Sequence, residues 1–328
     1  MTGRFLVTGG AGYVGSHLVA ALVDQGASVT VMDNFRTGHR AAVPPQARLV
    51  AADLADVEQI DALLAEGDWQ AVFHFAALSQ VGESMRMPMR YLLDNAANGM
   101  RLIDSCIRHG VMRFVLSSTA ALFNEPGEAP IPEGGRIDPQ SAYGDSKWMI
   151  ERALHWAGQV HGMRYACLRY FNAAGADPGG RLGEDHRPES HLIPLVIDAA
   201  LGRRPALEVY GNDYPTPDGT CIRDYIHVSD LATAHLLALE HLDQGAVVWN
   251  LGNGAGHSVR QVIAAVERVS GLTVPHRIAP RRAGDAAVLV ASSQRAQEAG
   301  WKPVHAALDE IVSTAFAWRK AHPYGYGD

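Results

Sequence analysis

The sequence predicts an α/β fold, a doubly wound parallel sheet followed by a smaller mixed α/β lobe. Three observations predict it. Short apolar runs alternate with segments of helical apolar period through the first 171 residues. A glycine-rich turn separates the first apolar run from the first helical segment, and the alternation ends after Phe171. Strands that alternate with helices in this way favour a sheet with helices on both faces.

The composition is typical of a folded protein that acts on a small molecule. The chain has 328 residues, 47% of them apolar, enough for one large domain or for a large and a small one. Its net charge of −7 argues against general binding to nucleic acid or anionic membranes, so a negatively charged substrate needs local arginines or lysines. The sequence shows no signal-peptide pattern and no apolar run near ~18 residues, and we expect a soluble cytoplasmic protein.

The residues that bind metals in other proteins do not form a regular pattern here. Three widely spaced cysteines indicate neither a disulfide framework nor a thiolate metal site. One short segment is rich in carboxylates and imidazoles, but it lacks the ligand spacing of a zinc site. We therefore expect no metal and a polar loop at Glu184, Asp185, His186, Glu189 and His191.

The first strand and helix enclose the glycine-rich turn. A buried strand is predicted from Arg4 to Thr8, and an apolar-periodic helix from Ser16 to Gln25. Between them Gly9, Gly12 and Gly15 form a GxxGxxG pattern, and this strand–glycines–helix context is the one in which the pattern counts as evidence for a dinucleotide site. Backbone N–H groups near Gly12, at the positive end of the helix, are placed to hold a pyrophosphate. The first lobe is therefore predicted to be a Rossmann-type domain.

The second strand, from Ser28 to Met32, ends on an acidic residue. Asp33 lies 18 residues beyond Gly15. A carboxylate there accepts both ribose hydroxyls of NAD and repels the 2′-phosphate of NADP. A turn or helix-cap role for Asp33 is the alternative. The nearby Arg36 leaves NADP as an alternative cofactor.

The next elements continue the alternation. They are a strand from Arg48 to Ala52, a helix from Asp56 to Glu66, a strand from Ala71 to Ala77 and a helical stretch from Pro88 to His109. The end of the Ala71 to Ala77 strand is expected to pass under the dinucleotide, near the switch point of the sheet. Asn95 and Asn98 lie inside the helical stretch; asparagine is a weak helix former, so one of them is expected to have a buried polar task, unless both are exposed.

The fifth strand and the following helix carry the chemistry. The strand from Arg113 to Leu116 ends in a Ser/Thr cluster that includes Thr119, and a polar loop then leads to a helix that runs to about His161. Tyr143 and Lys147 are four residues apart on that helix, so they project from one face. The ammonium is expected to lower the phenol pKa from its ordinary ~10, which makes the phenol a base for an alcohol proton.

The regular rhythm ends after the sixth strand, from Tyr165 to Tyr170. We expect a domain 1–171, with 223–243 returning to it, and a smaller lobe 172–328. The expected elements beyond residue 171 are helices from Leu192 to Gly202, Asp230 to His241, Val259 to Val269, Ser293 to Ala299 and Leu308 to Lys320, and strands at Leu207 to Tyr210, Ile226 to Val228 and Val247 to Leu251, the last of these in the smaller lobe.

These signals gain weight because they occur together. A lone GxxGxxG or a lone YxxxK is weak evidence, but here the glycines, Asp33, Thr119 and the Tyr143–Lys147 pair all fall at or beside the carboxyl edge of one sheet. They describe the chemistry of short-chain dehydrogenases/reductases, in which a tyrosine removes a hydroxyl proton while hydride passes to NAD⁺.

The whole chain resembles the UDP-glucose (UDP-galactose) 4-epimerase family of the extended short-chain dehydrogenase/reductase superfamily. The matching segments are VTGGAGYVGSH (7–17), MDN (32–34), HFAALSQVGES (74–84), SSTAA (117–121), YGDSK (143–147), LRYFNAAGADP (168–178), HLIP (191–194), YGNDYPTPDGTCIRDYIHVSDLA (210–232) and APRRAGD (279–285).

The resemblance implies the site residues and the partners. Catalysis is assigned to Tyr143, Lys147 and Thr119. The NAD-binding residues would be Gly9, Gly12, Tyr13, Val14, Gly15, Asp33, Asn34, Asp53, Leu54, Phe75, Ala76, Ala77, Ser79, Asn95, Ser117, Tyr143, Lys147 and Tyr170. The residues that contact the UDP-sugar would be Thr119, Tyr143, Phe171, Asn172, Leu192, Tyr210, Arg223, Arg282 and Asp285. The two arginines are the diphosphate clamp that an acidic protein needs, unless they form surface ion pairs. The resemblance also implies a homodimer.

The sequence departs from the family pattern at four places. Ser79 stands where some members have a lysine on the cofactor, and the usual asparagine pair is Asp94-Asn95, so either of these two residues could face NAD. Phe123-Asn124 replaces a Tyr-Gly pair after the Ser/Thr cluster. Leu289 lines the sugar pocket in the family, and its bulk favours a plain hexose over an N-acetylated sugar.

The residues after Thr119 distinguish epimerisation from its nearest alternative. Nucleotide-sugar 4,6-dehydratases carry acids there that take part in eliminating water, whereas Ala120 and Ala121 cannot transfer protons. We therefore expect interconversion of UDP-glucose and UDP-galactose. Two alternatives stay open, namely an epimerase of UDP-N-acetylhexosamine, UDP-xylose or UDP-glucuronate, and a non-catalytic dinucleotide sensor, which would have no need of Tyr143 and Lys147.

Overall fold

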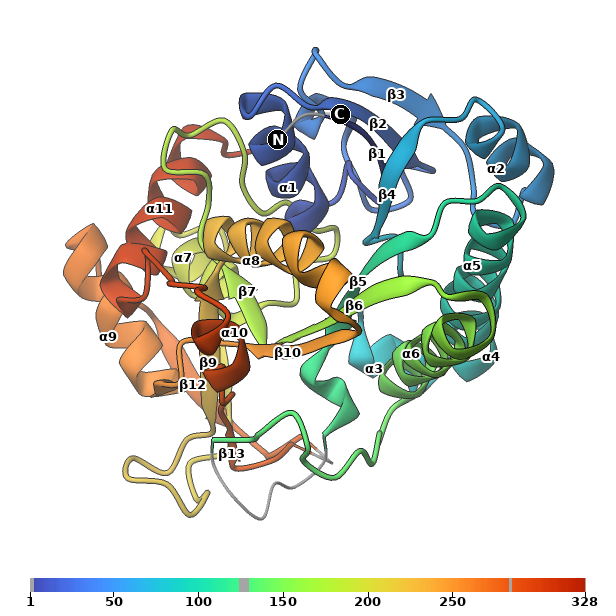
Figure 1. The fold of residues 1–328 in the computed structure, drawn as a ribbon. Coiled ribbons are helices and arrows are strands. Elements are labelled where there is room, and N and C mark those ends of the chain that lie inside the picture. The colour runs from blue at the N-terminus through green and yellow to red at the C-terminus, as the bar shows by residue number, and fades with distance from the viewer. Residues whose placement is uncertain (1–2, 124–129, 283–284, 328) are drawn as a thin grey trace.

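A seven-stranded parallel sheet forms the centre of the molecule (Figure 1). The structure is a computed structural model, and it describes residues 3–123, 130–282 and 285–327. The strand order is β10-β6-β5-β4-β1-β2-β3, so the order reverses between β1 and β4. The strands are β1 (Arg4–Thr8), β2 (Ser28–Asp33), β3 (Arg48–Ala51), β4 (Trp69–His74), β5 (Arg113–Thr119), β6 (Arg164–Tyr170) and β10 (Val247–Leu251).

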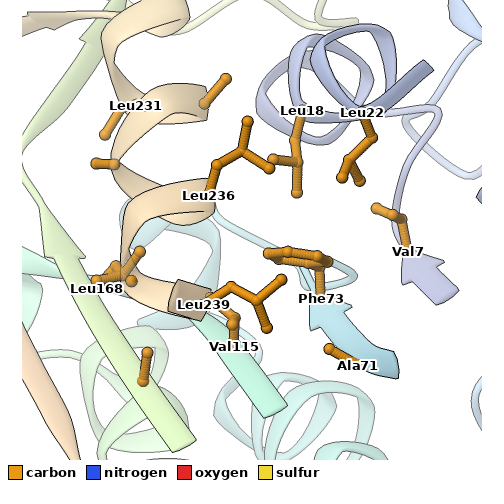
Figure 2. Packing of buried hydrophobic residues seen from close by; sticks show 14 of the residues in the cluster. Val7, Leu18, Leu22, Ala71, Phe73, Val115, Leu168, Leu231, Leu236 and Leu239 are labelled. Carbon is orange, nitrogen blue, oxygen red and sulfur yellow. The ribbon is translucent and has the colours of Figure 1, made fainter. Parts of the chain in front are cut away.

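Helices cover both faces of this sheet. On one face α1 (Tyr13–Asp24) packs beside α8 (Val228–His241), and the other face carries α2 (Val57–Leu64), α5 (Asn98–Arg108) and α6 (Ala142–His161). Figure 2 shows Leu18 and Leu236 reaching from these two neighbouring helices toward Phe73 of β4. Except in the edge strand β3, most residues of these strands are buried because both faces of the sheet are covered, as expected for a parallel sheet.

The second lobe has its own core beside the sheet. Two small sheets form it: β11-β9-β13 with β7 paired to β9, and β12 paired to β8. The elements of this region are β7 (Asn172–Ala174), α7 (Leu192–Ala200), β8 (Leu207–Tyr210), β9 (Ile222–His227), β11 (Gly256–Ser258), α9 (Val259–Ser270), β12 (His276–Ala279), β13 (Val288–Leu289), α10 (Gln294–Glu298) and α11 (Leu308–Ala321). Short helical turns complete the description at η1 (Arg40–Ala42), α3 (Val81–Ser84), α4 (Pro88–Tyr91), η2 (Leu92–Ala97), η3 (Ala120–Leu122) and η4 (Leu242–Gln244).

The predicted fold class is confirmed, and several elements differ from the prediction, three of them in ways that matter for the main sheet or the site. Helix α1 begins at Tyr13 instead of Ser16, so its first turn includes the last glycine of the pattern. The stretch from Pro88 to His109 is not one helix, because a π-helical turn separates α4 from α5. Strand β10, expected in the smaller lobe, pairs with β6 as a seventh strand of the main sheet, where its apolar residues are buried. Part of the predicted polar loop before α6 lies outside the described residues.

The division into two lobes at residue 171 remains our proposal. The return of the segment 223–243 to the first lobe is supported for α8, because Leu231 and Leu239 belong to the same core cluster as β1 and α1, whereas β9 pairs within the small sheets of the second lobe. Across the described residues, none of the helices combines the length and the apolar character that a membrane crossing requires.

Candidate active site

One large pocket lies at the carboxyl ends of the main-sheet strands, against the second lobe. Its volume is about 1400 Å³. Every residue assigned above to catalysis, to NAD or to the UDP-sugar lines it, although these residues come from positions as far apart as Gly9 and Asp285. Asn124, which belongs to one of the departures from the family pattern, and Ala283 and Gly284 of a matching segment lie outside the described residues.

The turn between β1 and α1 requires glycines because the backbone packs too closely there for larger side chains. Gly9 has a φ of +72°, and a Cβ on it would lie 2.4 Å from the backbone nitrogen of Ala76. A Cβ on Gly15 would lie 2.3 Å from the carbonyl oxygen of Gly9. Gly12 precedes α1 and lines the pocket, so the first N–H groups of the helix are available to a pyrophosphate.

The acidic residues after β2 and β3 are held in place by backbone and side-chain donors. Asp33 is buried, and its carboxylate accepts hydrogen bonds from the N–H groups of Ala11 (3.0 Å) and Phe35 (2.9 Å). Burial raises the pKa of Asp33, and the hydrogen bonds oppose this shift. The Asn34 amide donates to Asp53 at 2.7 Å, so these two residues form one unit at the rim of the pocket.

Asn95 and Asp94 have different tasks. Asn95 is buried, and its amide donates to the Leu78 carbonyl (2.9 Å) and to Ser146 Oγ (3.1 Å), while its oxygen accepts from the Leu78 N–H (2.8 Å). Asp94 instead pairs with the Arg36 guanidinium at 2.5 Å. Asn95 therefore fixes the loop after β4, which also carries Ser79, onto α6. Asn98 is buried too, so the alternative that both asparagines are exposed is wrong.

The catalytic candidates meet where β5 ends and α6 begins. Ser141 caps α6 by accepting a hydrogen bond from the Gly144 N–H at 3.1 Å. A Cβ on Gly144 would lie 2.3 Å from the carbonyl oxygen of Ala121, so the helix start packs directly on the turn after β5. This close packing brings the Tyr143 phenol near Thr119, whose hydroxyl favours a lower pKa of the phenol.

Lys147 lies one helical turn beyond Tyr143 and is almost completely buried, with 2% of its surface exposed. Its Nζ donates to the Ser117 carbonyl at 2.9 Å. Burial lowers the pKa of Lys147 to about 8, although the charge of Glu151 acts in the opposite direction. Lys147 is therefore an anchored, desolvated cation beneath the pocket.

The pKa of Tyr143 corrects one expectation. We expected Lys147 to lower it, but the net shift in the protein alone is upward. Burial disfavours the phenolate, and the hydrogen bond with Thr119 offsets only part of that effect. Lys147 is not among the causes of this shift, and sequence spacing carries no information on how much water the fold excludes.

A buried ion pair behind Lys147 was missed. Arg169 Nη2 donates to Glu151 Oε2 at 2.6 Å, and Ser118 Oγ donates to the same carboxylate at 2.5 Å. The group joins α6 to β5 and β6 and so supports the helix that carries the base. Glu151 is four residues beyond Lys147 on that helix. This spacing places the two side chains on one face, and it was the feature of the sequence that could have predicted a carboxylate near Lys147.

The first of the two candidate clamp arginines is anchored to backbone. Arg223 Nη1 donates to the carbonyls of Ile222 (2.9 Å) and Ala286 (2.8 Å). Its Nη2 lies 3.5 Å from Asp285 Oδ1, which is a long contact for an ion pair. The outer part of the guanidinium therefore stays available to a ligand in the pocket.

The second arginine lies against an aromatic ring. The guanidinium of Arg282 is stacked over Tyr210, 3.9 Å from the ring centroid. The Tyr210 hydroxyl donates to Glu208 at 2.7 Å, which fixes the ring. The other predicted sugar-side residues, Phe171, Asn172, Leu192 and Leu289, line the same part of the pocket, and the Asn172 amide donates to the Asp224 carbonyl at 2.8 Å.

Known proteins match this chain over nearly its whole length. The chain is 48% identical to a UDP-glucose 4-epimerase of Halalkalibacterium halodurans over 324 residues, which covers 98% of this chain and 97% of that protein. A solved structure of a UDP-glucose 4-epimerase superposes with a TM-score of 0.96 at 46% identity and covers 98% of this chain and 99% of that one. The UDP-glucose 4-epimerase from Brucella ovis, solved in complex with NAD, gives a TM-score of 0.93 at 43% identity, covering 96% and 98%.

A family model matches the region that holds the Rossmann-type lobe. It describes the NAD dependent epimerase/dehydratase family and aligns with residues 5–252. That range contains the glycine-rich turn, Asp33, Thr119, Tyr143, Lys147 and the first clamp arginine. The chain therefore belongs to the NAD dependent epimerase/dehydratase family.

Proposed function

We propose that this protein is an NAD-dependent epimerase that interconverts UDP-glucose and UDP-galactose through a transient 4-keto sugar. One observation carries the proposal. A single pocket is lined by Thr119, Tyr143 and Lys147 together with a dinucleotide turn and two arginines. The relatives that match the chain over nearly its whole length carry the same activity in their names.

The residues of the first lobe fit NAD. Gly9, Gly12 and Gly15 line the pocket beside the start of α1, where a pyrophosphate would bind, and Asp33 lines the same pocket and would receive the adenosine ribose. Arg36, which left NADP open, is paired with Asp94 and so does not offer an unengaged charge for a 2′-phosphate. NAD⁺, when bound, supplies the hydride acceptor and a positive charge near the base.

The chain's own groups handle the proton. Tyr143 Oη takes the proton of the sugar O4 hydroxyl, directly or through Thr119, while hydride leaves C4. The anchored Lys147 cation would favour the phenolate, against the effect of burial. After the 4-keto sugar has turned over, Tyr143 returns the proton as hydride adds to the opposite face, so no net oxidation occurs.

The arginines keep the substrate bound while the sugar turns. Arg223 and Arg282 line the same pocket as the base, and they would hold the diphosphate. A clamp on the diphosphate leaves the hexose free to rotate about its link to the phosphate. This is the requirement that distinguishes a 4-epimerase from an enzyme that reacts on one face only.

The dehydratase half of the family is disfavoured by the residues around Thr119. Elimination of water needs an acid and a base at C5 and C6, and Ala120 and Ala121 line the pocket at this point. Neither side chain transfers a proton. The 4-keto sugar therefore has no elimination route through these positions, and return of hydride is the remaining outcome.

A substrate panel tests the proposal. The purified protein is incubated separately with UDP-galactose, UDP-N-acetylgalactosamine and UDP-xylose, with no NAD⁺ added, and the epimers are separated by chromatography. We expect the highest kcat/KM for UDP-galactose. Turnover of another UDP-sugar alone would show that the chemistry is right and the sugar is wrong, and no turnover with any of them would contradict an epimerase.

We further propose a homodimer that works in the cytoplasm. Met100 of α5 and Trp156 and Val160 of α6 are large apolar residues exposed on the two long helices of the first lobe, which supports contact with a second copy there. Analytical ultracentrifugation of the wild type and of Trp156→Glu is the test. We expect a dimer that the charged variant converts to a monomer.

A further inference from the structure

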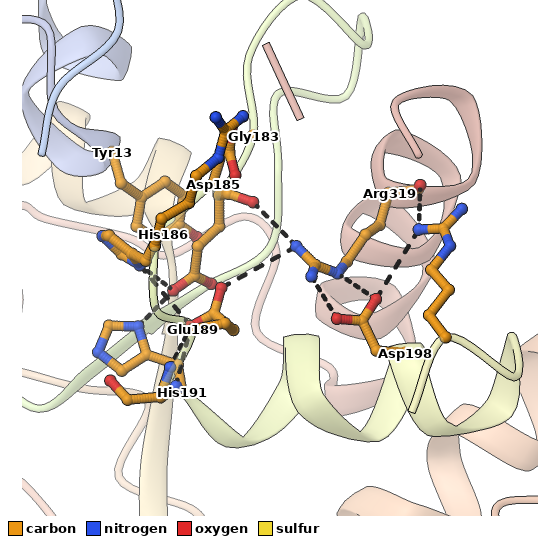
Figure 3. A network of polar contacts seen from close by, with 12 residues as sticks. Tyr13, Gly183, Asp185, His186, Glu189, His191, Asp198 and Arg319 are labelled. Atoms are coloured by element: carbon orange, nitrogen blue, oxygen red, sulfur yellow. Dashed lines mark hydrogen bonds and ion pairs between the residues drawn. The ribbon is translucent and has the colours of Figure 1, made fainter. Parts of the chain in front are cut away.

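Four side chains just before α7 converge on one point. Glu184, His186, Glu189 and His191 each offer a ligand atom, and these four atoms all lie within 4.8 Å of one another. Figure 3 shows His186, His191 and Glu189 gathered in this way beside Tyr13. We call the four residues the Glu/His cluster. The sequence predicted a polar loop here because the ligand spacing is irregular, but the fold removes that objection.

Two of the distances within the Glu/His cluster lie close to the ligand separation of a tetrahedral cation site. Zinc bonds of about 2.0–2.1 Å to nitrogen and oxygen place neighbouring ligands roughly 3.3 Å apart. His186 Nδ1 is 3.1 Å from Glu184 Oε1 and 3.8 Å from Glu189 Oε1, on either side of that value. His191 Nδ1 contacts the same Glu184 oxygen.

The charges also favour a divalent cation. Glu184 and Glu189 have only 6% and 9% of their side-chain surface exposed, and buried carboxylates require compensation. With neutral imidazoles the cluster carries a charge of −2, which one divalent cation neutralises.

The surroundings orient one of these carboxylates and leave part of it unsatisfied. Glu189 Oε1 accepts from the N–H groups of Ser190 (2.8 Å) and His191 (2.9 Å), the kind of outer contact that orients a metal ligand. Within the described residues, its other oxygen, Oε2, is buried without a hydrogen bond, and the Arg319 guanidinium, itself bound to Asp198, lies 4.0 Å away.

Protons are the competitor. Burial lowers the pKa of His186, but the hydrogen bonds and charges of Glu184 and Glu189 outweigh it and raise the pKa to about 10. A protonated imidazole cannot bind a metal, so a cation must displace these protons. The alternative to a bound cation is therefore a cluster in which both histidines are protonated, and the experiment must distinguish this state from the metal-bound one.

We propose that the Glu/His cluster is a binding site for one divalent transition-metal cation of the zinc class. Two imidazole nitrogens among four ligands select zinc over magnesium, which prefers oxygen. His186, Glu189 and His191 also line the large pocket. A cation there ties the loop that follows β7 to the start of α7 and so fixes one wall of the pocket next to Leu192. The site is structural and does not depend on the proposed epimerase activity.

Metal titration tests the proposal. The full-length protein, without a histidine tag, is stripped with a chelator and titrated calorimetrically with zinc chloride and, separately, with magnesium chloride. We expect one zinc ion per chain, no magnesium binding, and a melting temperature that rises with zinc concentration. Failure of the wild type to bind zinc, or equal binding of magnesium, would overturn the site and leave the imidazolium pair.

Variants locate the binding. His191→Ala removes a half-exposed ligand, and Glu189→Gln keeps the shape while removing a charge. His155→Ala is the matched control, because His155 is an exposed histidine on α6. We expect zinc affinity to fall at least about 10-fold in the first two, a loss that even an outer-shell change produces, and to stay unchanged in the control. Unchanged affinity in both cluster variants, or an equal loss in the control, would overturn the assignment.

Discussion

The floor and the wall of the pocket are built in opposite ways. The floor carries Tyr143 and Lys147, which are 9% and 2% exposed and lie where a strand end and a helix start are packed together. The wall carries Arg223 and Asp285, whose side chains are 16% and 33% exposed and only 3.5 Å apart at their closest. In the proposed function, the floor determines which reaction occurs, whereas the wall determines which molecule is held there.

This difference predicts how each region responds to change. A substitution in the floor acts on groups that are desolvated, so it alters proton affinity as well as contact. A substitution in the wall acts on groups that water still reaches, so it alters binding over a smaller range. The four predictions below test the floor first and then the wall, in order of falling effect.

Tyr143→Phe removes the hydroxyl that exchanges a proton with O4. We expect kcat to fall about 10²- to 10⁴-fold, the usual contribution of a general base, while bound NAD is unchanged because the ring remains. Kinetics with UDP-galactose and the absorbance of the retained cofactor measure both effects. Near wild-type turnover would show that another group is the base and that the floor is not specialised.

Lys147→Met tests how strongly the floor is desolvated. The folded pKa of about 8 lies below the ordinary 10.5, so folding disfavours the ammonium. The buried ammonium destabilises the folded wild type fully below pH 8, and this effect disappears as the pH rises toward 10.5. The free energy of unfolding of the wild type therefore increases relative to that of the variant by at most about 3 kcal/mol over this range. Urea unfolding of both proteins without cofactor, from pH 7 to 10.5, measures the gap. A constant gap would mean that Lys147 is hydrated in the folded state.

Arg223→Ala tests the wall. We expect KM for the UDP-sugar to rise about 10- to 100-fold and kcat to change much less, because the arginine binds the part of the substrate that does not react. Arg223→Lys is the control and should recover part of the loss, since lysine keeps the charge but not the two-pronged geometry. An equal weakening of NAD would place Arg223 outside the clamp.

Leu289→Ala is the mildest change. Leu289 is half-buried on the wall, and the resemblance to 4-epimerases places it beside the sugar. We expect the ratio of kcat/KM for UDP-N-acetylgalactosamine to that for UDP-galactose to rise about 10-fold at most, the effect of a few methylene groups in an apolar pocket. An unchanged ratio would show that the acetyl group is accommodated elsewhere.

The sequence predicted best the features that depend on local spacing. The positions of Gly9 to Gly15, of Asp33 and of the Tyr143–Lys147 pair follow from short-range geometry, and the structure brings all of them to one pocket. Features that depend on long-range pairing were not predicted. Strand β10 looked like part of the second lobe because its neighbours in sequence belong there, and only its pairing with β6 assigns it to the main sheet.

The same limit applies to side chains that meet only after folding. Arg169 and Glu151 are 18 residues apart on different elements, and the Glu/His cluster forms from an irregular loop. The pKa of Tyr143 shifts in the direction opposite to the expected one because burial is a property of the fold and not of the helix that carries the residue.

The contact between Gly144 and the carbonyl of Ala121 has a practical consequence for redesign. Since a Cβ at position 144 would lie 2.3 Å from that oxygen, the contact acts as a spacer that fixes the distance between strand end and helix start. Any larger residue at this position would slide the phenol away from Thr119 without touching either partner. Engineering for new nucleotide sugars should therefore keep Gly144 and vary the residues on the water-exposed side of the pocket.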